Sequence, residues 1–126
     1  MKEISTTQAP AAIGPYSQAI VTGKLVFVSG QVPIDPATGK VVVGDIRAEA
    51  RQSLTNVAAV LGAAGCSTSD VVKTTVYLTD MADFAAVNEV YESFFSRPYP
   101  ARSAVAVKAL PKGARVEVEC IAERVG

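Results

Sequence analysis

Residues 115–123 read Arg-Val-Glu-Val-Glu-Cys-Ile-Ala-Glu, a run in which charged and apolar side chains alternate. A period of two is typical of a β-strand that buries one face. The apolar side consists of Val116, Val118, Cys120 and Ala122. The opposite side consists of Arg115, Glu117, Glu119 and Glu123. The pattern predicts a half-buried strand over residues 115–124.

Two more strands are expected upstream, over residues 102–110 and 71–79. Pro, Lys, Gly and Ala at 111–114 form a short turn, which predicts a hairpin between strands 102–110 and 115–124. In that hairpin Arg102 lies opposite residue 121 or 122, about 13 Å from Glu117 along the sheet. In strand 71–79, the apolar side is expected to hold Val72, Thr74, Val76 and Leu78.

Helical spacing appears in two segments. Residues 46–64 carry an apolar stripe, with Asp45 as N-cap and Gly65 closing the helix. A second helix is expected to begin at Asp80 or Asp83 and to run to about Phe95, since Pro98 and Pro100 forbid its continuation. Shorter strands around turns at residues 22–24 and 35–39 complete the pattern.

These elements predict one domain over residues 1–126, of the α+β class: a mixed α/β sandwich with a single sheet and two helices on one face. The other face then lacks a helical cover. Lys73, Thr75 and Tyr77 are expected on it, together with Arg102, Ala104 and Ala106, while Val105 and Val107 lie on the opposite side. Such a face suits self-association or exposure to solvent, and self-association is favoured.

Composition excludes several function classes. Lys plus Arg and Asp plus Glu both number 12, so the net charge is zero, and no basic run indicates nucleic-acid binding. The chain has no histidine, which removes Ser–His and Cys–His nucleophiles and leaves a metal site short of ligands. Cys66 and Cys120 are expected to be reduced thiols in or near the core. No apolar leader or membrane span is visible, so the cytoplasm is expected.

Few residues stand out for chemistry, and each has an ordinary structural explanation. Asn88 interrupts an apolar helical stripe, and Arg102 follows Pro100 and Ala101 at a strand start. Arg102 could clamp a carboxylate or form a surface salt bridge. Glu117 could act in a site or belong to a solvated charged stripe. Glycines in Gly14-Pro15-Tyr16 and Ser29-Gly30-Gln31 could be turns or could let a ligand approach the backbone.

These same residues carry a resemblance that extends from about residue 2 to residue 123. The chain resembles the reactive intermediate deaminase (RidA, YjgF-like) family. The matching segments are residues 9–19 (APAAIGPYSQA), 28–31 (VSGQ), 72–78 (VKTTVYL), 83–84 (DF), 87–88 (VN), 100–103 (PARS) and 109–119 (ALPKGARVEVE).

The resemblance implies a chorismate-mutase-like fold and a homotrimer with active sites between subunits. It implies hydrolysis of 2-iminopropanoate and 2-iminobutanoate to 2-keto acids and ammonia, without a cofactor. Arg102 then holds the substrate carboxylate and Glu117 positions water, while Tyr16, Ser29, Gly30 and Asn88 fall on pocket positions. Ala104 also falls on a substrate-binding position, where the backbone near it and at Gly30 could hold the imine nitrogen. Many relatives carry cysteine in place of Ala104, a departure that leaves substrate preference open.

Other functions remain open at this point. A non-catalytic regulator that binds a keto or amino acid is the main alternative, because an arginine clamp serves binding as well as turnover. A ribonuclease is disfavoured by the zero net charge and the absence of histidine. Nothing in the residues bears on a chaperone role.

Overall fold

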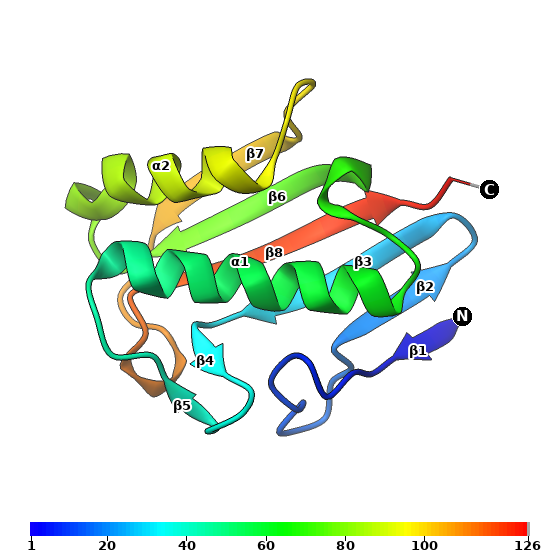
Figure 1. Ribbon diagram of the computed structural model, residues 1–126, viewed down its shortest axis with the longest axis horizontal. Coiled ribbons are helices and arrows are strands. Elements are labelled where there is room, and N and C mark those ends of the chain that lie inside the picture. Colours follow the sequence, from blue (N-terminus) through cyan, green and yellow to red (C-terminus); the bar gives the residue numbers. More distant parts are fainter. Residues whose placement is uncertain (126) are drawn as a thin grey trace.

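The computed structural model describes residues 1–125, which build one six-stranded sheet with two α-helices across one face (Figure 1). The strand order is β1-β2-β3-β8-β6-β7, and every pair is antiparallel except β6 and β7. The strands are β1 (Lys2–Ile4), β2 (Ala19–Thr22), β3 (Leu25–Gln31), β6 (Val71–Leu78), β7 (Ala101–Ala106) and β8 (Val116–Glu123). A separate hairpin joins β4 (Ile34–Asp35) to β5 (Lys40–Val41). Three 3₁₀ turns lie between these elements: η1 (Thr68–Asp70), η2 (Met81–Asp83) and η3 (Pro111–Gly113).

Both helices form where their sequence patterns place them. Helix α1 (Ile46–Ala63) begins after Asp45, whose carboxylate accepts a hydrogen bond from the Ala48 amide at 3.0 Å. Helix α2 (Phe84–Phe94) follows η2, where Asp80 accepts from the Ala82 amide at 2.9 Å. Both helices lie in front of the sheet in Figure 1 and cover its apolar side. None of the helices of residues 1–125 is both long and apolar enough to cross a membrane.

The core confirms the alternation in β8. Val116, Val118, Cys120 and Ala122 are at most 3% exposed. They pack with the buried stripe of α1, which includes Leu54, Val57 and Leu61. Burying each such side chain contributes roughly 1.5–3 kcal/mol. Cys66 and Cys120 are both free and buried, as expected.

The expected hairpin between the last two strands is wrong. Strand β7 pairs with β6, in parallel, and β8 lies on the other side of β6. Arg102 is therefore in register with Thr74 rather than with residue 121 or 122. The cause is the helix between β6 and β7, because a strand–helix–strand crossover places its two strands in parallel. The chain then crosses the end of β6 through η3 to reach β8.

The facing of two strands also differs from expectation. The register of β6 shifts between Val71 and Lys73, so Val71 is buried and Val72 is 47% exposed. In β7, Arg102 and Ala104 lie on the helix side, whereas Val105 is exposed on the opposite side. We call the side of the sheet away from α1 and α2 the helix-free face. It carries Phe27, Tyr77, Val105, Glu117 and Ile121.

Candidate functional site

Glu117 lies in a hollow at the end of β3, on the helix-free face. The hollow has a volume of about 560 Å³. Its walls come from the loop before β2, the β3–β4 connection and the η3 turn, and include Tyr16, Ser29, Gly30, Lys112 and Glu117. We call it the Glu117 hollow. Four of the seven residues proposed from the sequence meet there: Tyr16, Ser29, Gly30 and Glu117.

Glu117 packs directly against the backbone of Gly30, in space that a side chain at residue 30 would occupy. A Cβ atom added to Gly30 would lie 1.9 Å from Glu117 Oε2, far inside van der Waals contact. The pairing of β3 with β8 is irregular between Val28 and Gln31, which brings the backbone close to the carboxylate. Burial, and secondarily the negative charge of Glu119, raises the pKa of Glu117 above its ordinary value. The result is a half-buried carboxylate beside bare backbone in an open hollow.

Hydrogen bonds to the backbone hold the loop that carries Tyr16. Ser29 Oγ donates to the Ser17 carbonyl at 2.6 Å, so its hydroxyl ties β3 to this loop. Gln18, only 4% exposed, accepts from the Thr6 amide and donates to the carbonyls of Thr6 and Pro10. Tyr16 itself lines the hollow and is 51% exposed.

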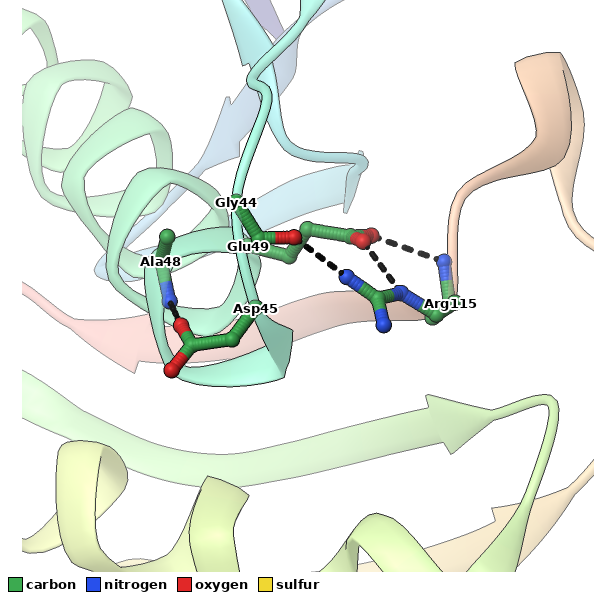
Figure 2. Close-up of polar contacts among 5 residues, drawn as sticks. All are labelled: Gly44, Asp45, Ala48, Glu49 and Arg115. Carbon is green, nitrogen blue, oxygen red and sulfur yellow. Dashed lines mark hydrogen bonds and ion pairs between the residues drawn. The ribbon is translucent and has the colours of Figure 1, made fainter.

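A buried carboxylate on α1 ties this helix to the residue before β8 (Figure 2). Glu49 of α1 is 4% exposed and accepts from the Arg115 amide at 2.9 Å and from Arg115 Nε. Arg115 also donates to the Gly44 carbonyl at 2.8 Å. These bonds anchor the start of β8 directly after η3, where Lys112 adopts a left-handed φ of 57°. The clamp therefore positions both Lys112 and the strand that presents Glu117.

Arg102 lies in a second hollow, formed by α2 and the loop before β7. Its volume is about 480 Å³, and we call it the Arg102 hollow; it is lined by Asn88, Tyr91, Glu92, Arg97, Tyr99, Pro100 and Arg102. Arg102 Nη1 donates to Asn88 Oδ1 at 2.7 Å. The guanidinium carbon lies 4.9 Å from the Tyr91 ring centroid and 5.2 Å from that of Phe84. Its other N–H groups have no hydrogen-bond partner among the described residues, so the guanidinium can donate to a bound carboxylate.

Within one chain the structure keeps Arg102 and Glu117 apart. Arg102 is in register with Thr74, and Glu117 with Tyr77, on opposite sides of β6. Two strand spacings and three residues of offset separate their backbones by about 14 Å. The side chain of Arg102 points toward α2, whereas that of Glu117 lies on the helix-free face. The two hollows are therefore separate half-sites in a single chain.

Ala104 joins neither hollow. It is half-buried on β7, where it packs against the core beneath the helices. It is in register with the buried Val76 and two residues from Arg102. Its expected role in binding substrate stays a prediction.

Comparison with known proteins places these features in a family. A family model described as endoribonuclease L-PSP matches residues 6–124. The chain belongs to this family. A goat (Capra hircus) protein named 2-iminobutanoate/2-iminopropanoate deaminase is 55% identical over 119 residues, or 94% of this chain and 87% of that protein.

Solved structures of similar proteins agree closely with the fold. A putative endoribonuclease from Thermotoga maritima superposes with a TM-score of 0.97 at 50% identity, covering 100% of this chain and 99% of the other. RidA from an Antarctic Psychrobacter superposes with a TM-score of 0.94 at 50% identity, covering 98% and 99%. The family and fold class expected from the sequence are therefore confirmed.

The sequence did not single out every residue that lines or supports the two hollows. Gln18, Glu49 and Lys112 escaped notice because their effect depends on long-range contacts with other segments. Arg97 and Tyr99 lie within five residues of Arg102, and this closeness in sequence could have indicated that they line the same hollow. No three His, Cys, Asp or Glu side chains gather as a metal site within residues 1–125.

Proposed function

We propose that the chain hydrolyses 2-imino acids such as 2-iminopropanoate and 2-iminobutanoate to the 2-keto acid and ammonia. The family assignment supports this reaction, because the goat relative carries the name of that deaminase. One structural observation carries the proposal: a guanidinium with free donors and a half-buried carboxylate each line an open hollow. The same relatives favour an enzyme over a regulator that only binds keto acids.

The chemistry needs orientation, a water molecule and a proton carrier. Arg102 binds the substrate carboxylate through its free N–H groups. Glu117 removes a proton from water as the water oxygen bonds to C2, and the C=N electron pair moves to nitrogen. The proton is then delivered to the nitrogen of the carbinolamine. The hydroxyl proton of the carbinolamine then moves through Glu117 to the same nitrogen as the C–N bond breaks, so that C2 becomes the ketone and ammonia leaves.

We propose further that the working site is shared between subunits of a homotrimer. Arg102 and Glu117 lie on opposite faces of one chain, so a three-carbon substrate cannot touch both. The helix-free face offers a surface for association, since Phe27 is 42% exposed and Val105 43% exposed. Arg102 of one subunit would then meet Glu117, Tyr16, Ser29 and Gly30 of the next. The amide of Asn88 orients Arg102 in this arrangement.

Neither nucleic acid nor membrane is proposed as a partner. The family model carries an endoribonuclease description, but this chain has zero net charge and no histidine. Binding to the phosphate backbone draws most of its affinity from cationic surfaces. We place the protein in the cytoplasm, which the two unpaired, buried cysteines support.

The activity is tested with imine generated in the cuvette. A flavin amino-acid oxidase acting on alanine releases 2-iminopropanoate, and semicarbazide traps whatever imine survives. We expect the protein to lower the rate of semicarbazone formation and to speed the appearance of pyruvate and ammonia. An unchanged trapping rate at micromolar protein would disprove the deaminase.

The shared site is tested by mixing two inactive variants. Arg102→Ala and Glu117→Ala trimers, mixed under conditions of subunit exchange, should regain partial activity because some mixed interfaces hold both intact residues. Light scattering on each variant first verifies that it is trimeric. Mixtures that stay inactive after proven exchange, or a wild-type chain that is monomeric and active, would contradict the shared site.

A further inference from the structure

The Arg102 hollow contains a second arginine that the proposed mechanism does not use. Arg97 lines this hollow together with Arg102, Tyr91 and Tyr99. Its guanidinium carbon lies 5.4 Å from the centroid of the Tyr99 ring. A cation held over an aromatic face in this way is kept in a preferred position rather than moving freely in solvent.

Arg97 has no ion-pair partner among residues 1–125. The salt bridges of the described chain join Arg47 to Glu89 and Arg115 to Glu49. Arg97 also makes no side-chain hydrogen bond there, whereas Arg102 makes one, to Asn88. Both guanidinium groups therefore keep donors available for an incoming ligand.

The two guanidinium groups with free donors let the hollow bind a ligand with two carboxylates. Glu92 is the one carboxylate among the described residues that line it, and it forms no ion pair with Arg97 or Arg102. If Arg102 binds the carboxylate on C1 of a 2-imino acid, the N–H donors of Arg97 remain available. Arginine binds a planar carboxylate through two parallel N–H donors, so a second carboxylate is the group that fits Arg97.

We propose that Arg97 binds a side-chain carboxylate, and that the enzyme prefers dicarboxylic 2-imino acids such as 2-iminosuccinate and 2-iminoglutarate. The inference rests on the proposed deaminase function and names its substrate class. The bonds that form and break are those of the hydrolysis given above, and Arg97 takes no part in them. Arg97 is thus a specificity residue, and its contribution falls on KM.

The test compares imines with and without the second carboxylate. Oxidation of aspartate and glutamate by a flavin oxidase supplies the dicarboxylic imines, and oxidation of alanine supplies 2-iminopropanoate. We expect the wild type to show the higher kcat/KM on at least one dicarboxylic imine. Arg97→Gln should lower that kcat/KM about tenfold through KM, with less than about a twofold change on 2-iminopropanoate.

A matched control and a binding measurement separate this inference from the proposed function. Arg51→Gln removes an exposed arginine from α1, outside both hollows, and should behave as wild type on every imine. Calorimetry with the stable product 2-oxoglutarate against 2-oxobutanoate should show a preference for the dicarboxylate that Arg97→Gln abolishes. Hydrolysis of 2-iminopropanoate with no dicarboxylate preference in kinetics or binding overturns the inference alone. Failure to hydrolyse any imine overturns the proposed function instead, and calorimetry still decides whether Arg97 selects dicarboxylates.

Discussion

Arg102→Lys should lower kcat/KM for 2-imino acids by about 30- to 1000-fold while leaving the melting temperature unchanged. Lysine keeps the positive charge but cannot form two parallel hydrogen bonds to a carboxylate. Losing a charge-assisted pair in the proposed site between subunits costs about 2–4 kcal/mol of transition-state stabilisation. Steady-state kinetics on freshly generated imine, with thermal unfolding in parallel, measures both quantities.

Arg51→Lys is the control for this experiment, because Arg51 is exposed on α1 and lines neither hollow. It should leave kcat/KM within about twofold of wild type. Near-normal activity in Arg102→Lys would remove the carboxylate clamp from the mechanism. The contact with Asn88 would then be a structural bond only.

Glu117→Gln should reduce kcat by about 100- to 10,000-fold, the range expected when a general base is lost. Glutamine keeps the shape beside Gly30 but cannot take a proton from water. Burial raises the pKa of Glu117 above its ordinary value. As the pH is lowered, the wild-type activity should therefore begin to fall at a higher pH than the pKa of an ordinary glutamate would give. The carboxylate form is the active one, so activity rises with pH through this pKa. The variant should lack that acid limb.

Glu123→Gln provides the matched control on the same strand. Glu123 is exposed near the end of β8, in register with Leu25 and away from both hollows. Its substitution should preserve both the rate and the acid limb. A Glu117→Gln enzyme with an unaltered pH profile would show that another group carries the proton.

Local patterns predicted the elements of this fold well, because each depends on neighbours in the sequence. Asp45 caps α1 as expected, and the apolar side of β8 is buried residue by residue. Alternation in β8 also placed Glu117 on the helix-free face. These features need only the period of a strand or helix and one capping side chain.

The pairing between strands could not be predicted from such local patterns. The turn at 111–114 predicted a hairpin, yet the crossover through α2 puts β7 on the far side of β6. Arg102 and Ala104 consequently face the helices, the side that Val105 and Val107 were expected to occupy. Alternation defines two sides of a strand, but only the tertiary arrangement decides which of them meets the helices.

The candidate site, too, could be predicted only in part from the residues themselves. The resemblance to known deaminases supplied Arg102, Glu117 and the pocket positions, whereas spacing alone left each of them with an ordinary structural explanation. The wrong hairpin still gave a wide separation of Arg102 and Glu117. The structure replaces that reasoning with a stronger one, since the side chains leave opposite faces of the sheet.

The opposed placement of Arg102 and Glu117 has a genetic consequence if the site is shared as proposed. A chain that leaves the assembly would carry two incomplete half-sites and no working one. Substitutions that weaken contacts between subunits and substitutions that remove a reacting group would then share one phenotype in the cell. Conversely, two defective alleles expressed together could rescue each other when one damages the Arg102 hollow and the other the Glu117 hollow. Natural selection for activity would then act on the residues that hold the subunits together as strongly as on the residues that react.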